Sequence, residues 1–129
     1  MLIKDKKILY ECINLIKKNP KLKKKKLNRI KNLEKRLYYI KVWSLTESQP
    51  LHKLKNHEKR CFYGRNCYHL DHKCSISEGF KNGILPEIIG RMDNLKFIKA
   101  KINMKKGYKV TKHRLQETLK KSRRFNKKR

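Results

Sequence analysis

The sequence predicts an α+β fold, in which a small core containing two strands lies between helical ends. Three observations predict it. Apolar residues recur at helical spacing through the first 48 residues, and a second helical pattern with Leu115 and Leu119 on one side follows residue 111. Between these regions, "CYHLDHKCSI" and "NLKFIKA" have the composition and alternation of strands.

Residues 1–48 are expected to form a basic helical hairpin. Apolar residues spaced by three and four predict a first amphipathic helix that ends near Lys18, and "NP" at 19–20 marks a boundary. A longer second helix follows, which we expect to fold back on the first. Its apolar stripe comprises Leu22, Leu27, Ile30, Leu33, Leu37 and Ile40.

The rest of the chain divides into three parts. Residues 49–66 contain Pro, Gly and Asn without a sustained period and are expected to be a linker. Residues 67–111 are expected to run strand, short helix, strand, helix, with Pro86 beginning a helix and Gly90 ending it. Residues 112–129 are expected to form a basic helix or tail.

The charge of the chain points to a polyanionic partner. The sequence carries 38 basic residues against 10 acidic ones, a formal net charge of +28. Nucleic acid is the leading candidate, because each neutralised phosphate releases counterions. A membrane is not expected as partner, since no apolar run approaches the roughly 20 residues that span a bilayer.

The cysteines are expected to be thiols or metal ligands. The first residues lack the apolar core and cleavage site of a signal peptide, which favours an intracellular, cytoplasmic protein. Cys61, Cys67 and Cys74 are spaced by six and seven, and the chain has no CxxC pair. A structural Zn²⁺ is therefore not expected, and Cys74 is expected to pack inside the domain.

Residues between 67 and 111 contain three short motifs in the order that is typical of a known protein family. Asp71-His72 stands at the end of the first strand, Asn94-Leu95 enters the second, and Asn103-x-x-Lys106-Gly107 begins the following helix. This series resembles an HNH endonuclease of the phage or mobile-intron (homing) kind, in the HNN variant. The resemblance covers about a third of the chain and implies a ββα-metal core. A helical insertion between His72 and Asn94 makes the gap longer than in compact members.

The resemblance implies a role for each motif residue. His72 would be the general base, and Asp71 and Asn103 would hold one divalent ion, Mg²⁺ or Mn²⁺. Asn94 would either orient His72 through its far ring nitrogen or tie the loop down. These roles suit the chemistry, since hydrolysis needs an activated water and a hard cation prefers oxygen ligands. The surrounding positive charge also disfavours protonated histidine.

Other residues are expected to contact nucleic acid. His69 shares a strand face with Asp71, where it either contacts substrate or packs on the sheet. The basic residues expected to bind phosphates are Lys106, Arg91, Lys105, Lys112, Arg114, Arg123 and Arg124. DNA is the expected substrate, and RNA stays open.

Two other functions are compatible with the sequence. One is a non-catalytic, highly basic nucleic-acid-binding protein, associated with ribosomes or packaging. The other is a small zinc-binding regulator built on the cysteines. For the nuclease, the sequence leaves open whether a monomer nicks one strand or a homodimer cuts both.

Overall fold

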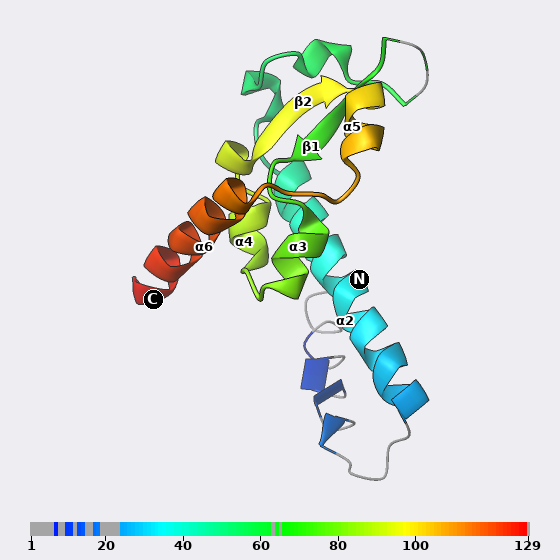
Figure 1. Cartoon of the computed structure of the whole chain (residues 1–129), viewed down its shortest axis with the longest axis vertical. Helices are drawn as coiled ribbons and strands as arrows, with labels where there is room; N and C mark the ends of the chain where they lie inside the picture. Colours follow the sequence, from blue (N-terminus) through cyan, green and yellow to red (C-terminus); the bar gives the residue numbers. More distant parts are fainter. Residues whose placement is uncertain are drawn as a thin grey trace. The chain divides into compact units, whose positions relative to one another are not determined.

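The structure, a computed structural model, forms two compact units, residues 1–37 and 38–129, which are described separately (Figure 1). Helix α2, Lys24–Glu47, contributes its first part to one unit and its last part to the other. The fold is α+β and mostly helical, with a two-stranded antiparallel sheet, as expected. The residues that the structure describes are 7, 10, 11, 13, 14, 17, 18, 24–62, 64 and 66–128.

In the first unit, Ile13 is buried together with Ile30 and Leu37 of α2, and Leu33 packs against this cluster. An ion pair joins Lys17 to Glu34. Most of the expected first helix and the boundary at 19–20 lie outside the described residues, as do Leu22 and the side chain of Leu27.

The last turns of α2 belong to the second unit. Val42 and Thr46, four residues apart, are fully buried, and the Tyr38 hydroxyl donates to the carbonyl oxygen of Ile84 at 2.6 Å. The second compact unit therefore begins at Tyr38, within α2. Ile40, expected on the apolar stripe, is instead 50% exposed. Its neighbours at 38, 42 and 46 supply the buried contacts in this part of the helix.

The sheet pairs β1, Tyr68–His72, with β2, Leu95–Lys99. In its register Asp71 lies opposite Lys96, and His72 lies opposite Leu95. Since successive side chains of a strand point to opposite faces, Asp71 and His72 project to different sides. The His72 side also carries Leu70, Leu95 and Phe97, which form a buried cluster.

The connection between the strands is helical, as expected. Helix α3, Ile76–Lys81, begins at Ser75, whose hydroxyl accepts from the N–H of Glu78. Helix α4, Pro86–Ile89, has Pro86 in its first turn and ends at Gly90. The short 3₁₀ helix η3, Met92–Asn94, leads into β2.

Two further helices follow β2. Helix α5, Ala100–Lys106, contacts both strands, and α6, Lys112–Lys127, contacts α4 (Figure 1). Leu115 and Leu119 of α6 pack against the main core, so the tail is an ordered part of the unit. That core comprises Val42, Cys74, Ile76, Ile84, Ile88 and Ile89. The burial of Cys74 agrees with the expectation from the sequence.

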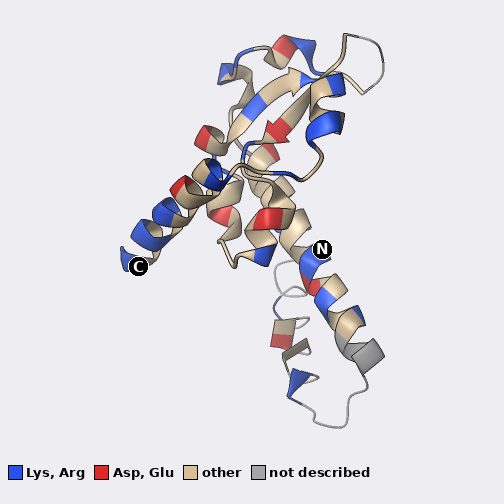
Figure 2. Cartoon of the chain, viewed as in Figure 1, with Lys and Arg blue, Asp and Glu red and all other residues tan. Residues whose placement is uncertain are grey.

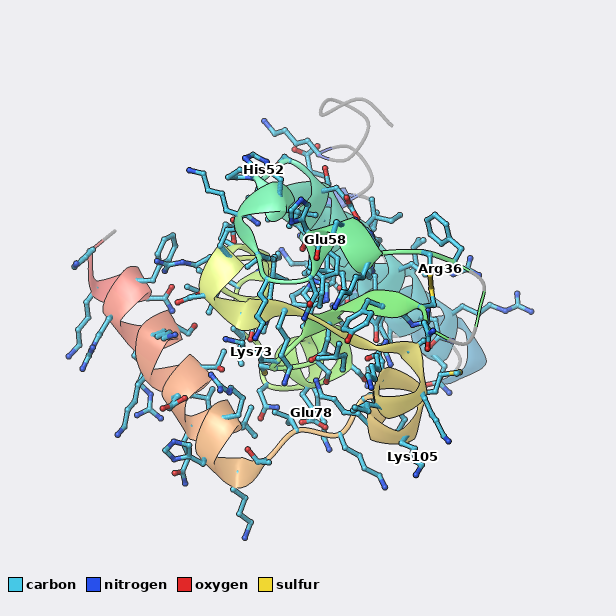
Figure 3. All side chains as sticks on the ribbon, turned by 90° about the horizontal axis from the view of Figure 1, so that it is seen from above. Arg36, His52, Glu58, Lys73, Glu78 and Lys105 are labelled. Carbon is cyan, nitrogen blue, oxygen red and sulfur yellow. A yellow bond between two sulfur atoms is a disulfide. The ribbon has the colours of Figure 1, made fainter. Side chains whose placement is uncertain are left out.

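The linker region holds two short 3₁₀ helices, η1, Leu51–Lys53, and η2, His57–Lys59. After them, Cys61 and Cys67 form a disulfide, drawn in yellow in Figure 3. The expectation that all cysteines are thiols or metal ligands is therefore wrong for this pair. The physical reason is a backbone bridge between Arg60 and Tyr68, which brings the two cysteine Cα atoms to 5.2 Å. None of the described helices is long and apolar enough to cross a bilayer.

Candidate functional site

A cavity of about 220 Å³ opens at the end of β1. Asp71 and His72 line it from the strand, and Asn103 lines it from α5. Trp43 lines it from α2, and Tyr108 from the segment after α5. Three residues that the sequence singles out therefore share one cavity, although they are up to 32 positions apart in the chain (71 to 103).

The His72 ring is held by two residues of α2. It is 5% exposed, and its Nε2 lies 2.9 Å from the Thr46 hydroxyl oxygen. The Trp43 ring packs edge-on against it, with ring centroids 4.9 Å apart. These contacts leave Nδ1 as the ring nitrogen without a hydrogen-bonded side chain among the described residues. A lone pair there requires that Nε2 carry the proton and donate to Thr46.

Burial keeps His72 neutral. Loss of solvation and, after it, the nearby Lys106 ammonium together lower its pKa from 6.5 to about 4, against an opposing effect of Glu47. The direction agrees with the expectation that positive surroundings disfavour protonated histidine. An imidazole that stays neutral at physiological pH can accept a proton, although a low pKa also makes it a weaker base.

The carboxylate of Asp71 is paired with a cation of the chain itself. Lys106 Nζ lies 2.7 Å from one of its carboxylate oxygens and 2.9 Å from the other. The same ammonium donates to the carbonyl oxygen of His72 at 3.0 Å. Asp71 is 5% exposed, so this buried charge depends on the lysine for its neutralisation.

The oxygens around Lys106 show that this place suits a cation. Two carboxylate oxygens and two backbone carbonyl oxygens, of His72 and Lys73, surround the ammonium. Oxygens of these kinds are also the ligands that hard divalent cations prefer. Among the described residues, no group of three or more His, Cys, Asp or Glu side chains could hold a metal ion. Asp71 supplies the carboxylate at this position, and Asn103, the other residue that the sequence assigns to a metal ion, lines the same cavity.

Asn94 ties the backbone around the site together. Its side-chain oxygen accepts from the N–H of Cys74 at 2.8 Å. Its amide nitrogen donates to the carbonyl oxygens of Cys74 at 3.1 Å and Ile89 at 2.7 Å. Of the two expectations for Asn94, the loop tie is therefore the one that the geometry shows. The hydrogen bond to the far nitrogen of His72 is wrong, because Thr46 occupies that nitrogen.

His69 lies on the α5 side of the sheet. It is half-buried, and its Nδ1 lies 3.4 Å from the amide nitrogen of Asn103. Both residues also line a neighbouring cavity with Trp43 and Arg60. His69 is thus in a position to orient Asn103.

The expected phosphate-binding residues fall into two classes. Lys106 is partly buried on Asp71, and Arg114 is half-buried with a guanidinium nitrogen 3.4 Å from Glu117. The others are exposed, in α5, in α6 and in the turn before η3: Arg91, Lys105, Lys112, Arg123 and Arg124. Figure 2 shows that basic residues recur along α5 and α6.

Sequence reasoning missed the contribution of α2 to the site. Thr46 is a hydroxyl on the buried face of an amphipathic helix, one turn after Val42, and that position could have marked it as the partner of a buried polar group. Trp43 follows Val42 on the same helix. The pairing of Lys106 with Asp71 had no sequence signal, because the two residues lie 35 positions apart on different elements.

Comparisons of this chain with protein-family models, with curated proteins and with solved structures find no match.

Proposed function

We propose that this protein is a metal-dependent DNA endonuclease of the HNH type, which hydrolyses phosphodiester bonds. The observation that carries the proposal is the shared cavity of Asp71, His72 and Asn103, behind which Asn94 holds the loop in place. A base, a carboxylate and an amide at one buried edge of a sheet form the set that metal-assisted hydrolysis needs.

Each side chain has a task in this proposal. His72 Nδ1 accepts the proton of the attacking water, while Nε2 donates to Thr46 and fixes the ring. Asp71 and Asn103 would hold one Mg²⁺ or Mn²⁺, which supplies charge stabilisation at the phosphate and at the departing oxygen. Trp43 and Tyr108 border the cavity, where they can contact a bound strand.

The net charge of +28 supports nucleic acid as the substrate. Exposed lysine and arginine side chains contact phosphates without reading sequence, so we expect binding that weakens steeply with salt. One chain offers one such cavity in its described part. A monomer would therefore nick a duplex, and a homodimer would be needed to cut both strands.

A plasmid assay tests the proposal. Supercoiled DNA is incubated with the protein and Mg²⁺ or Mn²⁺, with His72→Ala beside the wild type and His52→Ala as the control. His52 is exposed on η1, away from the cavity. We expect nicked circles with the wild type and the control, and intact DNA with His72→Ala. Equal cutting by His72→Ala would remove His72 as the base.

One observation favours a second candidate function, a non-catalytic nucleic-acid-binding protein. Lys106 already neutralises both oxygens of Asp71, so in this arrangement the carboxylate is not open to a metal ion. This candidate predicts tight, salt-sensitive DNA binding, no cutting with any divalent ion, and unchanged binding by His72→Ala.

A further inference from the structure

A second cavity, of about 420 Å³, lies between the sheet and the start of α6. Five cationic side chains line it: Lys73, Lys96, Lys106, Lys109 and Arg114. Figure 3 shows Lys73 between β2 and α6, the elements that carry Lys96 and Arg114. Residues from four separate segments thus place positive charge around a single hollow.

The positive charge in this cavity is only partly compensated. Asp71 neutralises Lys106, and Glu117 pairs with Arg114. Lys73 Nζ donates to the backbone carbonyl oxygen of Asp93 at 3.1 Å and also interacts electrostatically with the Asp93 carboxylate, which pairs with Lys121. Within the described ranges, no carboxylate forms an ion pair with Lys73, Lys96 or Lys109. Three ammonium groups around one hollow repel each other, and an anion would relieve that repulsion.

The N-terminus of α6 adds neutral donors to the same cavity. Thr111 caps this 16-residue helix and is itself a lining residue. Its hydroxyl accepts from the N–H of Arg114 at 3.2 Å. The remaining N–H groups of the first turn and the positive end of the helix dipole favour an anion.

We propose that this cavity binds a backbone phosphate of nucleic acid, next to the phosphate that would sit at His72. The choice of nucleic acid as the source of that phosphate rests on the proposed function. Lys106 lines the basic cavity and bonds Asp71, which lines the His72 cavity, so the Lys106–Asp71 pair connects the two hollows. A strand that crosses His72 would present its neighbouring phosphate to Lys96 and Lys109. An anion there also competes with Asp71 for Lys106.

The double variant Lys96→Gln/Lys109→Gln tests this site, because both side chains are exposed and removing their charges leaves the core unchanged. The control is Lys53→Gln/Lys55→Gln, which removes two charges that are also exposed but lie outside the cavity. Affinity for a short duplex is measured against salt concentration in EDTA. In a plot of log affinity for DNA against log salt concentration, we expect the steepness of the slope to fall in Lys96→Gln/Lys109→Gln by about 0.9 for each lost phosphate contact. The salt slope of the control variant should fall by clearly less. Equal slopes in the two double variants would overturn the proposal that this cavity binds phosphate.

Inorganic phosphate distinguishes the source of the anion. Backbone amide NMR shifts of residues 111–114 are followed as phosphate is added to the wild type and to Lys96→Gln/Lys109→Gln. Weak binding of inorganic phosphate, together with a weaker salt dependence of DNA affinity in the variant, supports a nucleic-acid site. Tight binding of inorganic phosphate that the variant loses, with an unchanged salt dependence of DNA affinity, would overturn the nucleic-acid site in favour of a free-phosphate site.

The plasmid assay separates this proposal from the proposed function. Metal-dependent nicking by the wild type, with equal DNA slopes in both double variants, overturns the phosphate site and leaves the nuclease. A reduced slope in Lys96→Gln/Lys109→Gln without nicking by the wild type supports the phosphate site and overturns the nuclease.

Discussion

The ammonium group of Lys106 bonds both carboxylate oxygens of Asp71, at 2.7 and 2.9 Å. A cation already fills the position where the proposed mechanism needs a divalent ion. Metal binding must therefore displace this lysine, and whatever draws Lys106 away from Asp71 favours the metal. This single contact links the stability of the fold to the proposed chemistry.

Lys106→Gln should destabilise the second unit. The substitution leaves the buried carboxylate of Asp71 without its counter-charge, which we expect to cost about 2 kcal/mol, since Lys106 itself is partly exposed. Urea unfolding at neutral pH measures the loss. Lys105→Gln, on the exposed side of the same helix, is the control and should change stability by less than about 0.5 kcal/mol.

Manganese should partly rescue Lys106→Gln. The vacated oxygens become available to a cation, so added Mn²⁺ should raise the Tm of this variant more than that of the wild type. The second variant, Lys106→Gln with Asp71→Asn, should show no such increase. An equal response of all three proteins to Mn²⁺ would contradict a metal site at Asp71.

Asn94→Ala should be among the more damaging substitutions in the chain. It removes three hydrogen bonds and leaves the N–H of Cys74 and the carbonyl of Ile89 buried without that partner. We expect a loss of about 3 kcal/mol in the free energy of unfolding. Asn82→Ala is the matched control, because the exposed side-chain amide of Asn82 bonds only Glu78 among the residues that the structure describes. Comparable losses in the two variants would show that the tie around Asn94 is unimportant.

His72 should make stability depend on pH between about 4 and 6.5. Its pKa is 6.5 when unfolded and about 4 in the fold, so the unfolded chain binds more protons in this window. The contribution is fully present above pH 6.5 and is lost as pH falls to 4. This difference between the pKa of the unfolded and the folded protein corresponds to about 3 kcal/mol.

The difference between wild type and His72→Gln isolates this effect from other titrating groups. Unfolding free energies are measured at intervals across the window, and the imidazole proton of His72 is titrated by NMR. Parallel stability curves for the two proteins would contradict the lowered pKa of His72.

Thr46→Val should disturb the His72 ring without changing the shape of the site. Valine matches threonine in size but cannot accept from Nε2, so the ring loses its fixed orientation and tautomer. We expect the nicking rate to fall on the order of 100-fold, as for misplaced reacting groups in general. The ¹⁵N shifts of His72 should report a changed tautomer mixture. Thr46→Ser should restore both properties, and failure to do so would indicate a role for Thr46 in packing alone.

The order of elements from β1 to α6 could be predicted from the sequence because local signals mark it. Pro86 and Gly90 bound α4 as expected, and Leu115 and Leu119 marked the buried side of α6. The loop tie by Asn94 was one of two expectations. The second one failed because α2 places Thr46 at the ring nitrogen, and no local pattern in the chain indicates which helix packs there.

Contacts between residues of different elements could not be predicted from the sequence. Lys106 was expected to touch a phosphate, and its bond to Asp71 depends on how α5 lies against β1. The Cys61–Cys67 disulfide depends on the bridge between Arg60 and Tyr68, which a linker composition does not predict. Both contacts are set by packing between elements, and periodicity describes only one element at a time.

The edge of the Trp43 ring against His72 gives the protein a built-in optical probe. Trp43 is the one tryptophan of the chain, so its emission comes from this place alone. A protonated imidazole quenches a neighbouring indole, and a bound ion or a strand of nucleic acid would alter its surroundings. Steady-state fluorescence of the unlabelled protein can thus follow, in one cuvette, every event at the cavity.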